Sequence, residues 1–234
     1  MSVRVKVPTA RAWSTADPYA TALRTGRGPL FLHRSDGWLL PLDIERWCAE
    51  PDAADRSVLH ACHGPTLDIG CGPGRLVTAV AARGLPALGI DVSPEAVHRT
   101  RATGGTALLR SVFDPLPREG RWRTALLIDG NIGIGGDPAA LLTRVRGVLH
   151  PHGRLITEAA PCGIPDDLDE RSEVRLHDGI GAHGITFPWA RVGPAALHRY
   201  AAAAGWVRES AWTVEGRRFV QLRGCHFSGR PADS

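Results

Sequence analysis

The sequence predicts a doubly wound α/β domain, in which helices cover both faces of a mainly parallel sheet. Short apolar runs that suit buried strands alternate over residues 66–158 with segments of helical periodicity. The first run ends in a glycine-rich turn, and the second, residues 87–91, ends in Asp91. Such a unit brings the turn and the carboxylate to one sheet edge, where open α/β proteins bind ligands.

The glycine turn has the sequence LDIGCGPGR over residues 67–75. Gly70, Gly72 and Gly74 lack a Cβ, so the backbone can turn sharply and approach a ligand closely. Apolar residues then recur at helical spacing over residues 75–82. The free N–H groups at the start of that helix would face a ligand bound over the turn.

Later elements carry their own local signals. Ser93-Pro94-Glu95 combines an N-cap, a proline at the first helical position and an acidic first turn, which predicts a helix to about Thr103. Asp137-Pro138 starts a helix to about His150 in the same way. We also expect strands over 106–112, 124–129 and 154–158, a helix over 194–204, and a hairpin of 207–214 with 217–223.

Two segments outside this core are harder to assign. Residues 13–62 are rich in aromatic side chains, which suits either a lid over the ligand or helices packed on the sheet, and residues 43–48 suit a helix. Residues 159–193 are broken by proline and glycine, which predicts a long loop over the carboxyl edge of the sheet. An alternating stretch at residues 3–7 could form a short edge strand.

Side chains around the turn discriminate between two nucleoside cofactors. A dinucleotide site needs a small residue where this chain has Arg75. A pyrophosphate beside Asp68 would meet like-charge repulsion, whereas a cationic amino acid end would not. Asp91 can accept hydrogen bonds from two ribose hydroxyls in either class. Asp68 and Arg75 therefore favour S-adenosylmethionine over NAD.

The chain resembles the class I S-adenosylmethionine-dependent methyltransferases. Five blocks carry the resemblance in the family's order: LDIGCGPGR at 67–75, GIDVSPEAV at 89–97, SVFD at 111–114, LLIDGN at 126–131 and VLHPHGRLITE at 148–158. The whole chain also looks like small actinobacterial methyltransferase-domain proteins that contain DGNIGIGGDP. The resemblance implies a Rossmann-like seven-stranded sheet of order 3-2-1-4-5-7-6, last strand antiparallel, with an N-terminal helical lid. The expected divisions are an arm and lid at 1–62, a methyltransferase domain at 63–225 and a disordered tail at 226–234.

The same resemblance implies which residues hold the cofactor. Asp68 would stabilise the methionyl amino group, and Asp91 would hold the ribose diol. Asp114 would accept from the adenine amino group, with a turn cap before Pro115 as its alternative role. The further cofactor residues implied are Gly70, Cys71, Gly72, Gly74, Val92, Phe113, Asp129, Gly130 and Asn131.

Methyl transfer from a sulfonium depends mainly on alignment, so a general base is optional. His177 and His183 are candidate bases because a histidine pKa near neutrality suits proton removal, although each could be a solvated loop residue. Tyr19 and Asn131 are further candidates for the catalytic site, and Asn131 could instead be a turn residue. Additional candidates are His33 and Glu158 as bases and Trp189 as a wall of the acceptor pocket.

Composition narrows the function classes. The 234 residues, 43% of them hydrophobic, suit one α/β domain. No apolar run approaches the ~20 residues of a membrane span, and the N-terminus lacks a signal-peptide core, so we expect no membrane partner and a cytoplasmic location. Five cysteines fit no metal or disulfide spacing, which predicts free thiols and no metal. Of 28 basic residues, only Lys6 is not arginine, and their scatter argues against a nucleic-acid partner despite the net charge of +4.

These observations predict methylation of a small-molecule acceptor in secondary or other small-molecule metabolism, at oxygen or nitrogen, with sulfur or carbon also open. The alternatives are an RNA or protein methyltransferase and a non-catalytic protein that keeps the cofactor fold. An NAD enzyme is third, disfavoured by Arg75. The acceptor, and the choice between monomer and homodimer, stay open.

Overall fold

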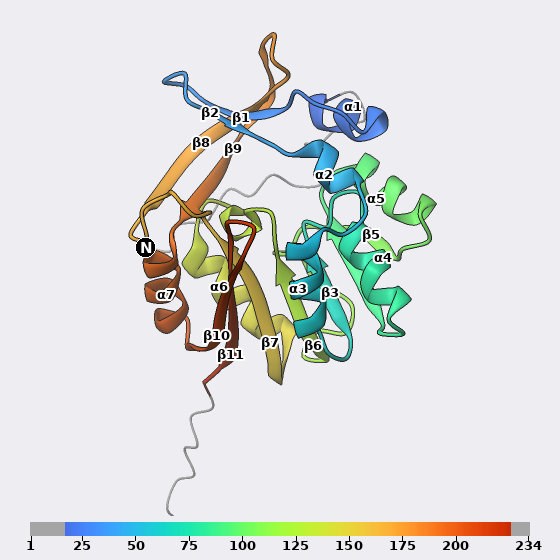
Figure 1. Cartoon of the computed structure of the whole chain (residues 1–234), viewed down its shortest axis with the longest axis vertical. Helices are drawn as coiled ribbons and strands as arrows, with labels where there is room; N and C mark the ends of the chain where they lie inside the picture. The colour runs from blue at the N-terminus through green and yellow to red at the C-terminus, as the bar shows by residue number, and fades with distance from the viewer. Residues whose placement is uncertain (1–16, 226–234) are drawn as a thin grey trace, which may run out of the picture.

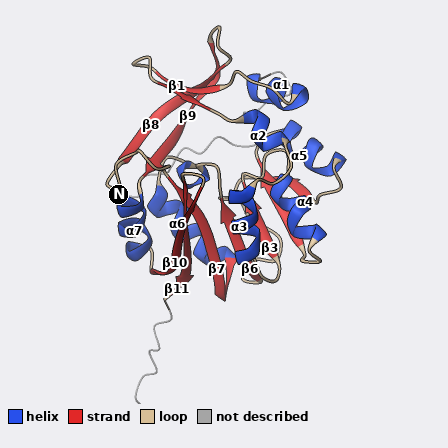
Figure 2. Ribbon diagram, viewed as in Figure 1, coloured by secondary structure: helices blue, strands red, loops and turns tan. Residues whose placement is uncertain are grey.

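The protein is described by a computed structural model for residues 17–225, which form two sheets and the helices around them (Figure 1; Figure 2). The possible strand at residues 3–7 and the expected tail at 226–234 lie outside the described residues. The helices are α1 (Pro18–Thr25), α2 (Ile44–Cys48), α3 (Ala53–Ala61), α4 (Arg75–Ala82), α5 (Pro94–Ala102), the 3₁₀ helix η2 (Asn131–Gly133), α6 (Pro138–Val148) and α7 (Pro194–Ala203). The strands are β1 (Phe31–Arg34), β2 (Leu39–Pro41), β3 (Thr66–Ile69), β4 (Ala87–Asp91), β5 (Ala107–Leu109), β6 (Trp122–Leu127), β7 (Leu149–Ala159), β8 (Asp169–His177), β9 (Ala182–Val192), β10 (Trp206–Val214) and β11 (Arg217–Gly224).

The larger sheet has the strand order β10-β11-β7-β6-β3-β4-β5. Its strands β3 to β7 are parallel, and β11 runs antiparallel between β7 and β10. Numbered along the chain, this is the order 3-2-1-4-5-7-6 with an antiparallel last strand, so the predicted sheet is confirmed. Ile69 pairs with Ile90, so the turn after β3 and Asp91 meet at one edge.

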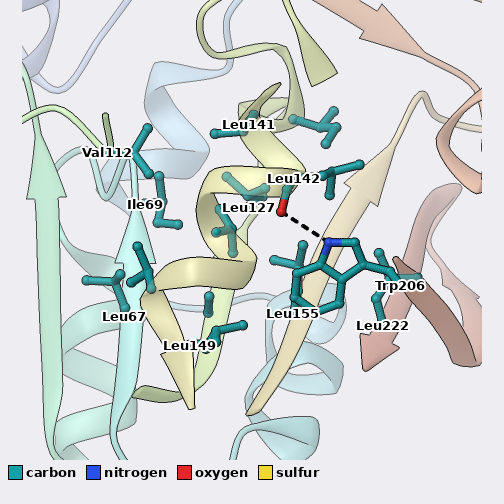
Figure 3. Close-up of a cluster of buried hydrophobic side chains, with 14 of the residues drawn as sticks. Leu67, Ile69, Val112, Leu127, Leu141, Leu142, Leu149, Leu155, Trp206 and Leu222 are labelled. Carbon is teal, nitrogen blue, oxygen red and sulfur yellow. Dashed lines mark hydrogen bonds between the residues drawn. The ribbon is translucent and has the colours of Figure 1, made fainter. Parts of the chain in front are cut away.

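Helices cover both faces of this sheet. On one face, α6 and α7 pack on a core that includes Leu67, Leu127 and Leu155 (Figure 3). The indole N–H of Trp206 donates to the Leu142 carbonyl of α6 at 3.1 Å, so this large ring is buried with its donor satisfied. On the other face, α3 and α4 form a second cluster with residues of β6, β7 and β11.

The second sheet has the order β2-β1-β8-β9 and is antiparallel throughout. Together with α1 and α2 it lies beyond one end of the larger sheet (Figure 1), and we call these six elements the lid. The lid has its own core, in which Leu30, Ile44 and Phe187 are buried. The prediction of a long loop over residues 159–193 is wrong, because β8 and β9 form a hairpin that pairs with β1.

The N-terminal segment that was expected to form an arm and lid belongs to two parts of the fold. In residues 1–62, α1, β1, β2 and α2 belong to the lid, whereas α3 packs on α4 and the larger sheet. The lid is therefore built from two stretches of chain and is half sheet, not only helical. Within residues 17–225, no helix is both long enough and apolar enough to cross a membrane.

Candidate cofactor and acceptor site

The glycine turn after β3 is held by hydrogen bonds to β4 and to Asn131, which follows β6. The backbone N–H groups of Gly70 and Cys71 both donate to the Ile90 carbonyl, at 2.8 and 3.1 Å. The Asn131 side-chain amide donates to the carbonyls of Ile69 and Gly70, at 2.9 Å each. Gly70 has φ +72°, and a Cβ there would lie 2.6 Å from Asn131 Nδ2. Glycine is required at this position by both backbone conformation and space.

Asp91, at the end of β4, faces the cavity with both carboxylate oxygens anchored. Oδ2 accepts from the Gly72 N–H at 2.9 Å, and Oδ1 accepts from the Ser93 N–H at 2.8 Å. Burial raises the pKa of Asp91, and the backbone donors Ser93, Gly72 and Val92 oppose that rise. Each oxygen keeps a second acceptor position, so this carboxylate can hold a pair of vicinal hydroxyls.

Asp68 lies in β3 behind the turn and outside the cavity wall, with 5% of its surface exposed. Burial raises its pKa to about 7; Arg75 opposes this rise, and the carboxylates of Asp129 and Asp91 add to it. A carboxyl in this position ionises at a cost, and a bound cation nearby would reduce that cost. The role of Asp68 beside a cationic group stays a prediction, because Asp68 does not line the cavity.

Arg75, where a dinucleotide site needs a small residue, is the centre of a buried ion network. Its Nε and Nη2 donate to Asp55 at 2.8 and 2.9 Å, and its Nη1 lies 2.8 Å from Asp129 Oδ2. Asp129 also contacts Arg46 Nη2 at 2.8 Å and Arg217 Nη2 at 3.1 Å. Burial acts to raise the pKa of Asp129, but the three arginines outweigh it and hold that pKa below its usual range.

The same arginines hold Asp55 as an anion. Burial acts to raise the pKa of Asp55, but hydrogen bonds and charge from Arg75 and Arg217 lower it to about 2. Asp129 also has a positive φ of 59°, which is uncommon outside glycine. The network therefore holds a strained residue at the end of β6 in its ionised form.

A cavity of about 1110 Å³, its open mouth included, separates the lid from the carboxyl edge of the larger sheet. Its sheet-side wall contains Ile69, Gly70, Cys71, Gly72, Pro73, Arg75, Ile90, Asp91, Val92, Arg110, Ser111, Val112, Asp129 and Asn131. Its lid-side wall contains Tyr19, Leu32, Leu42, Trp47, Leu176, Phe187, Pro188 and Trp189, and Ile134 and Gly135 complete it. All the charged side chains of the wall thus lie on the side where the cofactor was expected, and the opposite side is largely apolar.

Several predicted cofactor residues do not reach this wall. Asp114 is exposed, and its Oδ2 accepts from the Ser111 N–H at 3.3 Å, so it caps the turn, as its alternative role proposed. Phe113 packs against the main core. Ser111 and Val112 line the cavity where these two residues were expected.

Two of the predicted glycines also lie outside the wall. Gly74 is the N-cap of α4, and a Cβ there would lie 2.5 Å from the Thr100 side chain of α5. It therefore permits close helix packing. Gly130 has φ +79° in the turn before η2.

The histidine candidates lie away from the cavity wall formed by residues 17–225. His177 accepts from the Gly179 N–H through Nδ1 at 3.0 Å, and its ring lies 5.4 Å from that of His33. His183, near the end of the β8–β9 hairpin, contacts Asp178 at 2.9 Å. The geometry contradicts the placement of His177 and His183 over the acceptor.

Of the remaining candidates for the catalytic site, one belongs to the ion network and two line the cavity. Glu158 accepts from Arg217 at 2.8 Å within the ion network. Tyr19 and Trp189 line the cavity as expected. Tyr19 lies edge-on to Trp47, with ring centroids 6.4 Å apart.

Sequence reasoning missed several wall residues. Trp47 was one of many aromatics in residues 13–62, and the pattern did not distinguish it from Trp38, which does not line the cavity. Phe187 and Trp189 are separated by one residue, so strand periodicity would have placed both on one face. Ser111 lies two residues after the end of β5 and carries no charge that marks it.

A family model for a methyltransferase domain matches residues 66–153, from β3 into β7. The chain is 35% identical over 131 residues to a trans-aconitate 2-methyltransferase of Methylobacterium radiotolerans, a match that covers 53% of this chain and 45% of that protein. It is 33% identical over 106 residues to an uncharacterized methyltransferase of Mycobacterium tuberculosis, covering 45% of this chain and 43% of the relative. The matches thus span less than half the length of these curated relatives.

Solved structures extend the likeness to the whole fold. A SAM-dependent methyltransferase from Bacteroides fragilis, in complex with S-adenosylhomocysteine, has a TM-score of 0.70 at 18% identity and covers 97% of this chain and 98% of its own. A 1,6-didemethyltoxoflavin-N1-methyltransferase from Burkholderia thailandensis has a TM-score of 0.56 at 18% identity, covering 74% and 78%. The matched domain supports the predicted cofactor class, and the likeness to these solved structures shows that the chain has the class I S-adenosylmethionine-dependent methyltransferase fold.

Proposed function

We propose that this protein transfers the methyl group of S-adenosylmethionine to a small-molecule acceptor held beneath the lid. One observation carries the proposal: a single cavity joins the glycine turn and Asp91 on one wall to an apolar lid wall on the other. Bound there, the cofactor supplies a methyl group already activated by its sulfonium. The protein then has to align the acceptor and exclude water.

The residues on the sheet side fit this cofactor. Gly70 and Gly72 contribute backbone without side chains to the cavity wall, and the anchored Asp91 can accept from the ribose hydroxyls. Buried Asp68, with its raised pKa, fits a neighbouring ammonium group. Val92 and Val112 add apolar surface to the same wall for a planar base.

Apart from Asp91, which is assigned to the cofactor, the cavity wall within residues 17–225 supplies no side chain suited to act as a base near neutral pH. Burial and the charge of Asp91 raise the pKa of Tyr19 well above its ordinary value, and burial also raises the pKa of the Cys71 thiol. Asp129 is held as an anion by three arginines. The proposed acceptor therefore brings its own free lone pair, as an amine, a carboxylate or a thiolate does.

The comparisons are consistent with such an acceptor. The Methylobacterium relative is named for trans-aconitate, and the Burkholderia structure for an N1-methyltransferase acting on 1,6-didemethyltoxoflavin. Both names denote small molecules. The lid of this chain offers a similarly enclosed compartment, with the tryptophans Trp47 and Trp189 on its wall.

Calorimetry with S-adenosylhomocysteine tests the cofactor half of the proposal. We expect the wild-type protein to bind it, and Asp91→Ala to lose the ribose contact and weaken binding by at least about a hundredfold, which corresponds to roughly 2.7 kcal/mol. Asp114→Ala is the matched control, because Asp114 lies outside the cavity wall. Absence of wild-type binding would refute the proposed function, and loss of binding in Asp114→Ala alone would refute the site.

A further inference from the structure

The loop that follows β6, DGNIGIGGDP at residues 129–138, contacts both the glycine turn and the lid. At its start, the Asn131 amide donates to two carbonyls of the turn, at 2.9 Å each. Three residues later, Ile134 forms an antiparallel bridge with Trp189 of the lid strand β9. A few residues of backbone therefore connect Trp189 to the turn over which the cofactor is expected.

Two glycines of this loop let β9 approach it closely. A Cβ at Gly133 would overlap the Ala190 carbonyl oxygen and lie 2.7 Å from Trp189 Nε1. A Cβ at Gly136, which has φ +68°, would lie 2.7 Å from Pro188 Cβ. Because a side chain does not fit in these contacts, a larger residue at either position would push β9 away from the loop, and Trp189 with it.

The Trp189 indole is held in place where it lines the cavity. Its Nε1 edge lies against Gly133, and its ring meets Phe187 edge-to-face, with centroids 6.3 Å apart and planes at 86°. Tyr19 and Trp47 form a second edge-to-face pair on the same lid-side wall. Aromatic rings that are fixed in this way offer a pre-organised surface on which a planar ligand can stack.

The wall around these rings offers no countercharge to an ionic acceptor. Among the residues that the structure describes, the lid-side wall has no charged side chain. On the sheet side, Arg75 and Asp129 pair with each other at 2.8 Å. Arg110 is exposed, and its backbone N–H donates to the carbonyl of Asp91 at 2.9 Å, which places it beside the expected ribose. An ion held against the lid would therefore lose its hydration without compensation.

This charge pattern narrows the acceptors that bring their own lone pair. Carboxylates and thiolates are anions, and an aliphatic amine is a cation without a free lone pair near neutral pH. A nitrogen in a heteroaromatic ring, or an amino group on an aromatic ring, is uncharged under the same conditions and keeps its lone pair. The aromatic wall and the missing countercharge thus favour the same chemical class.

We propose that the acceptor is an uncharged, planar aromatic nitrogen compound that stacks on Trp189, and that Gly133 and Gly136 are positioning residues that hold Trp189 in place. This inference rests on the function proposed above and names its substrate class. The nitrogen lone pair forms the new bond to the methyl carbon while the carbon–sulfur bond breaks, and the electron pair of that bond goes to sulfur. The positive charge passes to nitrogen, and an aromatic amine then releases its N–H proton to water.

Three probes of similar size test the substrate class. Isoquinoline is planar and uncharged at pH 8, 2-naphthoate is planar and anionic, and 2-decalol is uncharged and saturated. Each is titrated into protein saturated with S-adenosylhomocysteine. We expect isoquinoline to bind at least about fivefold more tightly than either of the others. With S-adenosylmethionine, mass spectrometry should detect N-methylisoquinolinium.

Variants of Trp189 and of the loop test the positions. Trp189→Leu should abolish the preference for isoquinoline over 2-decalol, and Trp189→Phe, which keeps a ring, should retain part of it. Trp38→Leu is the matched control, because Trp38 belongs to the lid but not to the cavity wall. Gly133→Ala and Gly136→Ala should reduce the preference while leaving the affinity for S-adenosylhomocysteine unchanged. Circular dichroism verifies that each variant is folded.

Each part of the proposal has an outcome that overturns it. The substrate class is wrong if 2-naphthoate or 2-decalol binds the wild type as tightly as isoquinoline does. Stacking is refuted if Trp189→Leu retains the preference, and the positioning role is refuted if folded Gly133→Ala and Gly136→Ala both retain it. A wild type that binds isoquinoline but forms no N-methylisoquinolinium refutes nitrogen as the attacking atom.

The outcome is separate from that of the proposed function. A wild-type protein that does not bind S-adenosylhomocysteine refutes the proposed methyl transfer. In that case the three probes, titrated into the ligand-free protein and into Trp189→Leu, still decide whether Trp189 selects a planar, uncharged ring.

Discussion

Asp68 should make the ligand-free protein less stable at neutral pH than a neutral side chain of the same shape would. Burial raises its pKa from the ordinary 3.8 to about 7, with only 5% of the residue exposed. That rise corresponds to a cost of about 4 kcal/mol for keeping the carboxylate ionised in the folded protein. Asp68→Asn removes the ionisation but adds an amide donor, so we expect the free energy of unfolding at pH 8 to rise by about 1–3 kcal/mol.

The pH dependence follows from the direction of the shift. Between about pH 4 and pH 7 the folded protein retains a proton on Asp68 that the unfolded chain has released, so this group's contribution to stability falls as the pH rises. Below that window both states are protonated and the contribution is constant; above it the full cost is present. The stability gained by Asp68→Asn should therefore grow from pH 5 to pH 8.

Urea denaturation of ligand-free wild type and Asp68→Asn at pH 5, 6.5 and 8 measures this difference. Asp129→Asn is an informative control, because the same chemical change should lower stability by about 3 kcal/mol where three arginines surround the carboxylate. The reasoning fails if Asp68→Asn is no more stable than wild type at pH 8, or if the difference does not change with pH. The affinity of the wild type for S-adenosylhomocysteine should rise over the same pH window, and Asp68→Asn should flatten that rise.

Two further substitutions test the network and the turn. Arg75→Met leaves the fully buried Asp55 with Arg217 as its remaining ion-pair partner, so we expect the free energy of unfolding, measured by urea denaturation, to fall by about 3 kcal/mol. Adding Asp55→Asn should restore part of this loss, and a double mutant whose two effects simply add would contradict the coupling. Gly70→Ala should weaken S-adenosylhomocysteine binding more than about tenfold in calorimetry, because its Cβ meets the Asn131 amide at 2.6 Å. Gly147→Ala, in α6 with open space around its Cβ, should instead add about 0.5 kcal/mol of stability and leave binding unchanged.

The larger sheet could be predicted because its signals are local. Asp137 Oδ1 accepts from the N–H groups of Ala139 and Ala140, and Ser93 Oγ accepts from the Ala96 N–H, so each helix start is determined within a few residues of sequence. The strands of a parallel sheet are buried on both faces and read as short apolar runs. The turn and Asp91 could be identified for the same reason, since a few consecutive residues shape each of them.

The role of Arg75 shows a limit of that local view. Its size explained why a dinucleotide is disfavoured, but its charge is used in contacts with Asp55 from α3 and Asp129 after β6. Those partners are distant in sequence, and no spacing rule connects them. The ion network at the base of the cavity therefore became visible only in the folded chain.

The lid could not be predicted because its pairing is non-local. β1 and β2 form one local hairpin and β8 and β9 another, but the pairing of β8 with β1 joins segments from opposite sides of the core in sequence, and no local signal marks it. Taken as a loop, residues 159–193 would let His177 turn toward the acceptor. Held in a strand, His177 must face away from its neighbour Leu176, which lines the cavity.

The register of the lid therefore decides what an acceptor meets. Leu32 pairs with Leu176, and both line the cavity, while Phe31 pairs with His177 on the other face. A slip of one residue in β8 would exchange Leu176 for His177 and turn an apolar wall into one that carries a base. The cofactor motif leaves that choice open. Under the proposed function, selectivity for the acceptor follows from how two distant segments pair above the sheet, and substitutions in β1 and β8 should alter it without affecting the binding of S-adenosylmethionine.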